Sequence, residues 1–157
     1  MTTRSNAAAI LLAFAILSCA VYQKKQPTEG DKAVVTAYVE AWNQRDSVAI
    51  DTLLARDGIH EDVAQNFKGK GSKEVVAFMR DEVRREPDFK WTVTNVLEDG
   101  RNVAVEWTWV ASYTGPDLTG KQITNRRISG KGTSIAEVDE GKIKRFTDYY
   151  DIASFFR

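Results

Sequence analysis

The spacing of hydrophobic residues changes three times along the chain. Residues 7–17 form an unbroken apolar run, and residues 20–30 are mainly polar and show no apolar period. From residue 31 to Pro87, apolar residues mostly recur every three or four positions, which predicts helices. Beyond Pro87 they recur at every second position, which predicts strands. The pattern therefore predicts one domain over residues 31–157, with helices first and a sheet second.

Three helices and a short strand are expected before Pro87. The first helix begins at Thr28 or Asp31, since either side chain can accept a hydrogen bond from the first backbone amides of a helix. Ser72 would cap the third helix in the same way, and Pro87 closes it. The expected order is a helix from residue 31 to 42, a helix from 48 to 57, a strand from 58 to 62, a loop containing Gly69 and Gly71, and a helix from 72 to 86.

The strongest pattern in the chain is the alternation on one long strand. Six residues of this strand share one face: Val103, Val105, Trp107, Trp109, Ala111 and Tyr113. Glycine-containing turns at residues 98–100 and 139–141 predict hairpins, and Gly130 and Gly132 predict bulges in the next strand. Because a bulged sheet twists strongly, the predicted fold class is α+β, with three N-terminal helices packed on a strongly curved, mostly antiparallel sheet that forms a cone with an internal pocket.

The aromatic residues of this strand have two alternative roles. Trp107, Trp109 and Tyr113 line an apolar ligand pocket, or they are plain core. Strand alternation does not distinguish the two, because it shows only which face a side chain takes. The C-terminal residues 152–156 are apolar enough to pack onto the sheet or to serve an interface.

The composition narrows the chemistry to a few residues. The 157 residues include 22 basic and 22 acidic side chains, so the basic surplus that drives nucleic-acid binding is absent and no nucleic-acid partner is expected. One cysteine and one histidine cannot form a disulfide framework or a zinc site that takes several such ligands. No motif indicates a metal ion or an organic cofactor, and we expect neither.

The amino-terminal segment predicts export. The apolar run is shorter than the roughly 20 residues that span a bilayer, but it suits a secretory signal. It ends in Ile16-Leu17-Ser18-Cys19, which resembles the bacterial lipobox, where the cysteine is lipidated. We therefore expect a signal peptide over residues 1–18 and a tether over residues 19–30, with Cys19 as a lipid anchor on the periplasmic or cell-surface side. With an ordinary signal peptide or an uncleaved anchor instead, the domain still lies outside the cytoplasm.

Four segments of the domain resemble the nuclear transport factor 2-like superfamily, particularly its SnoaL-like and ketosteroid isomerase-like branches. They are residues 34–46, Gly58-Ile59-His60-Glu61-Asp62, Gly141-Lys142-Ile143 and Asp148-Tyr149-Tyr150-Asp151. The resemblance covers nearly all of residues 31–157 and implies a cone-shaped fold, a pocket for a small hydrophobic molecule and a homodimer formed through the sheet. Because the superfamily includes isomerases, cyclases, hydrolases, dehydratases and non-catalytic binding proteins, the fold does not specify the reaction.

The resemblance also implies roles for individual residues. The tyrosine donor of ketosteroid isomerase-like proteins matches Tyr38, and their carboxylate base matches Asp62. Their protonated carboxylic acid is replaced by Ser134, so that oxyanion site is incomplete. The acid/base carboxylate of the SnoaL-like cyclases matches Asp148. The epoxide hydrolase branch needs an arginine and a second aspartate where residues 106–109 have neither, so epoxide hydrolysis is not expected.

His60 is a further candidate, and two functions stay open. His60 shares one side of its strand with Asp62, so the two can form a pair in the pocket, where the imidazole acts as a base near neutral pH; alternatively, His60 is a structural histidine. Tyr38 can equally be a core tyrosine, and Asp62 a turn carboxylate. The chain is an exported acid/base enzyme of isomerase or cyclase type, or a non-catalytic lipoprotein that binds a ligand or dimerises. An enzyme requires Asp62 or Asp148 inside the pocket, whereas a binder turns both to solvent.

Overall fold

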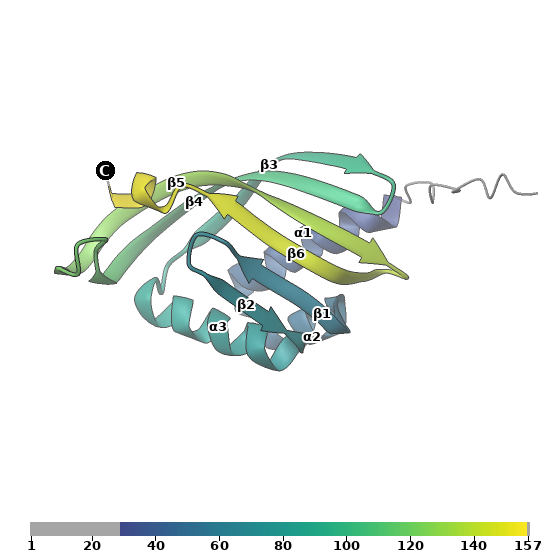
Figure 1. The fold of residues 1–157 in the computed structure, drawn as a ribbon, viewed down its shortest axis with the longest axis horizontal. Coiled ribbons are helices and arrows are strands. Elements are labelled where there is room, and N and C mark those ends of the chain that lie inside the picture. The colour runs from purple at the N-terminus through teal and green to yellow at the C-terminus, as the bar shows by residue number, and fades with distance from the viewer. Residues whose placement is uncertain (1–28, 157) are drawn as a thin grey trace, which may run out of the picture.

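The computed structural model describes residues 29–156, which form three α-helices, a six-stranded sheet and a short terminal 3-10 helix (Figure 1). The expectations for residues 1–28, which include the signal peptide, the anchor at Cys19, the Thr28 cap and most of the tether, lie outside the described residues. The elements are α1 (Glu29–Gln44), α2 (Ser47–Leu53), β1 (Leu54–Asp62), β2 (Phe67–Lys70), α3 (Gly71–Arg85), β3 (Lys90–Asp99), β4 (Asn102–Pro116), β5 (Gln122–Asp139), β6 (Lys142–Tyr150) and η1 (Ile152–Phe156).

The sheet is curved, and the helices cover one of its faces (Figure 1). Its strands lie in the order β2-β1-β6-β5-β4-β3. Neighbouring strands are antiparallel except β1 and β6, which are parallel and place Asp62 beside Asp148. The predicted α+β class, with three helices on a mostly antiparallel sheet, is confirmed.

The polar segment between α1 and α2 ends one helix and begins the next. Arg45 adopts a positive φ of 57°, which is typical of a residue that follows a helix. The Asp46 side chain then accepts hydrogen bonds from the amides of Val48 and Ala49, at 3.0 and 2.9 Å, and so caps α2. Asn43 pairs with the backbone of Trp91 through two hydrogen bonds of 2.8 Å, which fixes the end of α1 against β3.

The region before α3 differs from the prediction. The expected loop at Gly69 is the strand β2, which pairs with β1 and is too short to show a period. Ser72 does not cap α3, because the helix already begins at Gly71, where φ is +74° and glycine is therefore favoured. Glu74 instead reaches back and accepts a hydrogen bond of 2.8 Å from the amide of Lys70. Asp31 likewise lies inside α1, which begins at Glu29, and does not cap it.

The two glycines of β5 do not form bulges, and this expectation was wrong. The register between β4 and β5 runs without interruption past both of them, pairing Trp109 with Gly130 and Trp107 with Gly132. Each glycine instead leaves room for an aromatic ring above the strand. A Cβ added at Gly132 would lie 2.6 Å from Cη2 of Trp107, and one added at Gly130 would overlap the ring of Phe155.

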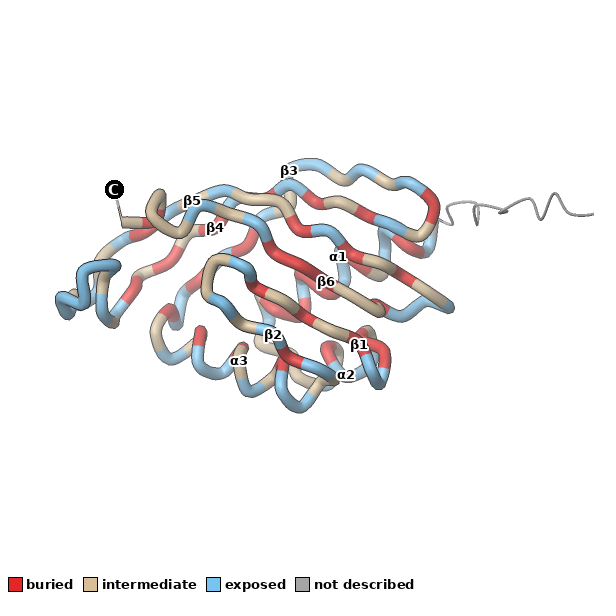
Figure 2. The backbone as a smooth tube through the Cα atoms, in the orientation of Figure 1, coloured by how far each residue is buried: buried red, intermediate tan, exposed pale blue. Residues whose placement is uncertain are grey.

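The concave face of the sheet is the core face. All six residues of the alternating pattern on β4 are buried, and buried segments of the neighbouring strands continue this face (Figure 2). The helices bury Val35, Tyr38 and Trp42 of α1 and Val75 and Met79 of α3 against the same core. The buried faces of the helices therefore pack against the buried face of the sheet, and a cavity lies between them.

Candidate active site

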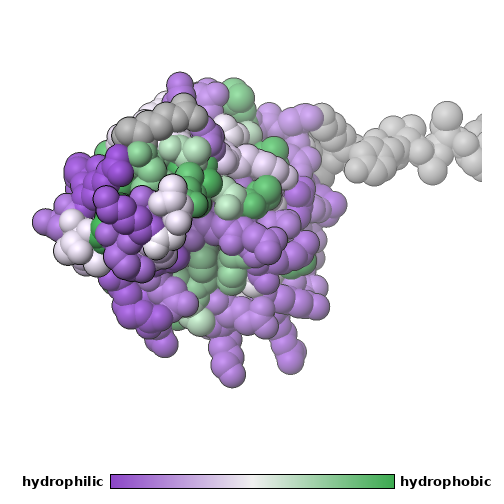
Figure 3. Space-filling model, turned by 60° about the vertical axis from the view of Figure 1, so that its left-hand side comes forward, coloured by the Kyte–Doolittle hydropathy of each residue, from purple (hydrophilic) through white to green (hydrophobic). Residues whose placement is uncertain are grey.

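A cavity of about 130 Å³ lies between the helices and the concave face of the sheet. This volume is similar to that of an apolar protein cavity of about 150 Å³ that holds one benzene molecule. The lining includes Pro116 and Leu118 at the tip of the β4–β5 hairpin, and Leu118 is largely exposed, so the cavity opens toward that end. In a view turned toward this end, hydrophobic residues gather between hydrophilic ones (Figure 3).

The lining combines aromatic rings with ionisable groups. The aromatic members are Trp42, Phe78, Trp91, Trp107, Trp109, Tyr113, Tyr150, Phe155 and Phe156. The ionisable members are His60, Asp62, Glu82, Arg85, Glu86 and Asp148. Such a wall suits a small hydrophobic ligand on which a proton is transferred. Among the residues that the structure describes, no group of three or more His, Cys, Asp or Glu side chains could hold a metal ion.

A buried hydrogen-bonded chain crosses the inner wall of the cavity. Tyr38 Oη of α1 lies 2.9 Å from His60 Nδ1 of β1, and His60 Nε2 lies 2.9 Å from Asp148 Oδ2 of β6. Ser134 of β5 hydrogen-bonds the other oxygen of Asp148, and Trp107 Nε1 of β4 donates to Ser134 Oγ at 2.8 Å. All five residues are buried, so this chain fixes the orientation of Asp148 without help from solvent.

The direction of each hydrogen bond follows from the donors. Indole N–H can only donate, so Ser134 accepts from Trp107 and donates its own proton to Asp148 Oδ1. Burial raises the pKa of the Tyr38 hydroxyl above its ordinary value, so Tyr38 remains protonated and donates to His60 Nδ1. This assignment places the imidazole proton on Nε2, where it is donated to Asp148 Oδ2. Both oxygens of Asp148 thus act as acceptors.

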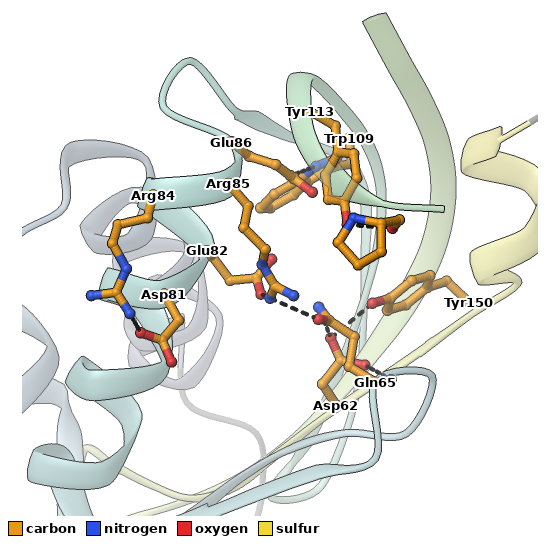
Figure 4. A network of polar contacts seen from close by, with 11 residues as sticks. Asp62, Gln65, Asp81, Glu82, Arg84, Arg85, Glu86, Trp109, Tyr113 and Tyr150 are labelled. Atoms are coloured by element: carbon orange, nitrogen blue, oxygen red, sulfur yellow. Dashed lines mark hydrogen bonds and ion pairs between the residues drawn. The ribbon is translucent and has the colours of Figure 1, made fainter. Parts of the chain in front are cut away.

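A second polar cluster lies nearer the mouth (Figure 4). Asp62 Oδ2 accepts hydrogen bonds from Tyr150 Oη at 2.9 Å and from the Gln65 side chain at 3.2 Å, and Oδ1 accepts from the Gln65 amide at 2.9 Å. Gln65 in turn accepts from Arg85 at 3.1 Å, and Arg85 forms an ion pair with Glu82. This cluster ties the loop after β1 to the last turn of α3.

The carboxyl groups of this cluster are held in an environment that favours their protonated forms. Burial raises the pKa of Asp62, and the nearby Asp148 carboxylate raises it further. Burial also raises the pKa of Glu82. For Glu86, burial and the neighbouring Glu82 raise the pKa to about 7, although Trp109 Nε1 donates a hydrogen bond of 2.7 Å to Glu86 Oε2. Perturbed carboxyl groups in a cavity are typical of sites that transfer protons.

The predicted site residues fall into two groups. Asp62, Asp148, His60, Trp107, Trp109 and Tyr113 all line the cavity. Tyr38 does not line it, because it lies behind His60, and its hydroxyl is bound to the imidazole. Ser134 similarly lies behind Asp148. His60, expected to pair with Asp62 of its own strand, instead pairs with Asp148 of the neighbouring strand.

Several lining residues were missed by the sequence reasoning. They are mainly the polar residues of α3 and of the loop after β1: Gln65, Glu82, Arg85 and Glu86. A signal was present, since Glu82 and Glu86 continue the buried helical stripe of Val75 and Met79 at intervals of three and four. Carboxylates on the buried stripe of a helix indicate a cavity or a paired charge, because carboxylates are rarely buried without a partner.

Comparison with known proteins identifies the family. A family model of SnoaL-like polyketide cyclases matches residues 32–157. The comparison with curated proteins found no match.

Solved structures support the same fold. A SnoaL-like polyketide cyclase candidate from Jannaschia sp. CCS1 has a TM-score of 0.72 and 14% identity, over 84% of this chain and 94% of that chain. A hypothetical protein with a ketosteroid isomerase-like fold from Catenulispora acidiphila, in complex with trimethylamine, has a TM-score of 0.68 and 20% identity, over 78% of this chain and 88% of that chain. IdmH, a polyketide cyclase candidate from Streptomyces antibioticus, has a TM-score of 0.69 and 16% identity, over 80% and 95%. The resemblance read from the sequence is confirmed, and the chain belongs to the SnoaL-like polyketide cyclase family.

Proposed function

We propose that this protein is an acid/base enzyme of the isomerase or cyclase type that acts on a small hydrophobic molecule, with Asp148 as the group that moves the proton. One observation carries the proposal. The Asp148 carboxylate lines the cavity while His60 and Ser134 hold its two oxygens in place. A carboxylate held in this way is a positioned general base, which is the central requirement of this chemistry.

The chemistry follows from this geometry. Asp148 takes a proton from a carbon next to a substrate carbonyl, and the electron pair of the C–H bond moves into an enolate. In a cyclisation the enolate carbon forms a bond to a second carbonyl carbon, and the resulting alkoxide takes the proton back. In an isomerisation the proton returns to a different carbon. His60 and Ser134 act as positioning residues, since they touch Asp148, while the aromatic walls exclude water.

The base-catalysed ring opening of nitrobenzisoxazole tests this proposal without knowledge of the natural substrate. This probe is an aromatic carbon acid, and its product, a coloured cyano-nitrophenolate, is followed by absorbance. Asp148→Asn should lower the rate by about 100-fold or more, since general base catalysis contributes roughly 10² to 10⁴. The matched control is Asp57→Asn, because Asp57 is an exposed residue of the neighbouring strand β1. An Asp148→Asn variant that keeps the wild-type rate would refute the proposal.

A non-catalytic binding protein is the second candidate. Asp62 and Asp148 lie in the cavity and not toward solvent, which favours the enzyme, but one observation favours the binding protein. Each carboxylate oxygen of Asp62 and Asp148 already accepts a hydrogen bond from within the protein. Such satisfied carboxylates can simply shape a ligand pocket. In this case the probe quenches the fluorescence of the cavity tryptophans, but its ring opening stays at the rate in buffer with both the wild type and Asp148→Asn.

We further propose that the domain works outside the cytoplasm, attached to a membrane through lipidated Cys19. The support is the apolar run and the lipobox-like segment, which lie outside the described residues. Within residues 29–156, no helix is long and apolar enough to cross a membrane. Mass spectrometry of the protein from bacterial membranes should show a lipid on an amino-terminal Cys19, and Cys19→Ser should release it. An unmodified full-length terminus would contradict the proposal.

The homodimer implied by the family resemblance is also a proposal. Residues Ile135 and Tyr149 leave apolar surface exposed on the sheet. Light scattering of the domain should give twice the chain mass, and the mass of a single chain over the micromolar range would contradict it.

A further inference from the structure

We propose that Glu86 is a second catalytic residue, which gives a proton to a substrate oxygen while Asp148 removes a proton from carbon. This inference rests on the proposed acid/base function. It adds a general acid, because Asp148 alone supplies only a general base. Glu86 is not implied by the family resemblance, and no motif in the sequence marks it. Three features single out Glu86: its place in the cavity, the hydrogen bond to one of its oxygens and the groups that surround it.

Glu86 is held at the end of α3 with its side chain in the cavity wall. Its amide donates a hydrogen bond of 2.7 Å to the carbonyl of Glu82, which closes the last turn of the helix. The side chain is buried, lines the cavity and accepts the 2.7 Å hydrogen bond from Trp109 Nε1. Trp109 is itself fixed by stacking on Phe89, with ring centroids 4.6 Å apart.

The hydrogen bond to Trp109 determines which oxygen carries the proton. An indole N–H only donates, and the carbonyl oxygen of a protonated carboxyl group is a better acceptor than its hydroxyl oxygen, so Oε2 is assigned as the oxygen without the proton. A proton on Glu86 is therefore placed on Oε1. Oε2 of Glu86 therefore accepts a hydrogen bond from the indole, while Oε1 can donate its proton.

The groups around Glu86 favour a carboxyl that is protonated near neutral pH. From α3 it faces Glu82 and Arg85, from the following turn Asp88, and from β4 Trp109 and Tyr113. Arg85 is already engaged by Glu82 and Gln65, so it does not serve as a dedicated counter-ion for Glu86. With burial as the largest cause, the pKa of Glu86 is about 7. A carboxyl group with this pKa can give up a proton near neutral pH.

The two carboxyl groups lie in contrasting environments of one cavity. Both oxygens of Asp148 accept hydrogen bonds, from an imidazole and a hydroxyl, whereas Glu86 has one neutral donor and a second carboxyl nearby. Two carboxyl groups whose surroundings differ in this way divide into base and acid. Because the cavity is about the size of one aromatic ring, a ligand that fills it contacts both walls.

The step is balanced for a benzisoxazole probe. Asp148 takes the proton from carbon, the electron pair of the C–H bond forms the nitrile, and the N–O bond breaks with its electron pair on oxygen. Glu86 gives its proton to this oxygen, so the product leaves as a phenol. Asp148 is then protonated and Glu86 is ionised, and exchange with solvent restores both.

Two probes with different leaving groups test the inference. The nitro-substituted probe leaves as a stable phenolate and needs little help, whereas the unsubstituted one needs the acid. Glu86→Gln should therefore lower the rate with unsubstituted benzisoxazole about tenfold more than the rate with the nitro compound. It should also remove the fall in the wild-type rate above a pH of about 7. The matched control is Glu106→Gln, since Glu106 is an exposed residue of β4.

The outcomes separate this inference from the proposed function. If Asp148→Asn leaves both rates unchanged, the proposed function fails. If Asp148→Asn abolishes both rates while Glu86→Gln alters them equally, or keeps the alkaline fall, only the role of Glu86 is overturned. Trp109→Phe serves if Glu86→Gln does not fold. Loss of the indole donor removes a hydrogen bond that lowers the pKa of Glu86, so the alkaline fall should move to higher pH. An unmoved profile would also overturn the inference.

Discussion

Replacing Gly130 with alanine should detach the terminal helix η1 from the sheet and so destabilise the protein. In a Phe155→Ala background, the same replacement should instead stabilise it. Gly130 of β5 lies beneath the ring of Phe155, which also lines the cavity and stacks on Tyr150 with centroids 5.1 Å apart. A Cβ at position 130 would overlap this ring and would lie 2.8 Å from its Cζ atom. Since β5 is a central strand and η1 is terminal, Phe155 is the residue that must move.

The size of the effect follows from the burial of Phe155. Its side chain is only 9% exposed, and full burial of such a ring contributes about 1.5–3 kcal/mol. Alanine in a strand is favoured over glycine by about 0.5–1 kcal/mol, and Gly130 does not have a positive φ that would oppose alanine. Gly130→Ala should therefore lower the free energy of unfolding by about 1–2 kcal/mol. In a Phe155→Ala background the overlap is gone, and the same substitution should raise it by about 0.5 kcal/mol.

Urea unfolding of the wild type, both single variants and the double variant measures this coupling. Independent sites add to within about 0.5 kcal/mol, so a coupling near 2 kcal/mol is well resolved. An equal loss of unfolding free energy in both backgrounds would contradict this prediction, because the strain would then lie in the strand and not against Phe155. Binding of nitrobenzisoxazole, followed by tryptophan fluorescence, should weaken in parallel, since Phe155 forms part of the cavity wall.

Two further predictions concern the polar groups of the cavity. Ser134→Ala removes the partner of Trp107 Nε1 and of one oxygen of Asp148, so the free energy of unfolding in urea should fall by about 1–3 kcal/mol. Thr133→Ala, on the opposite face of β5, is the control. A fall below about 0.5 kcal/mol would show that neither group depends on Ser134. The pKa of Glu86 is raised from 4.5 to about 7, so the native state binds the extra proton and stability should fall as pH rises from about 4.5 to 7, by at most about 3 kcal/mol. Glu86→Gln should flatten this part of the stability profile, and an unchanged slope would mean that Glu86 does not cause it.

The helices and the long strand could be predicted from the sequence because their patterns are local. The burial of Val35, Tyr38 and Trp42 repeats with the helical period, and the buried face of β4 repeats with the period of a strand. Two of the expectations that failed concern contacts with distant residues. Gly130 and Gly132 make room for the rings of Phe155 and Trp107, and the glycines alone could not distinguish this from a bulge.

The candidate site also combines features that can be read from the sequence with features that depend on distant contacts. From the residue types alone, carboxylates, one histidine and a row of aromatic rings are the groups that can carry any chemistry, and the family resemblance indicates Asp62 and Asp148 among them. How these groups combine depends on the fold. The parallel pairing of β1 with β6 joins His60 to Asp148 across 88 positions of the chain, and no local period encodes such a pairing.

The role of Glu86, on the helical side of the cavity, likewise depends on tertiary packing. Its residue type and its place at the end of a helix can be read from the sequence, but its burial and its bond to Trp109 cannot. These depend on where α3 packs against β4, and they shift the pKa of an ordinary glutamate toward neutrality. The sequence determines which groups can ionise, whereas the fold determines their solvation and their neighbours, and therefore which of them give or take a proton.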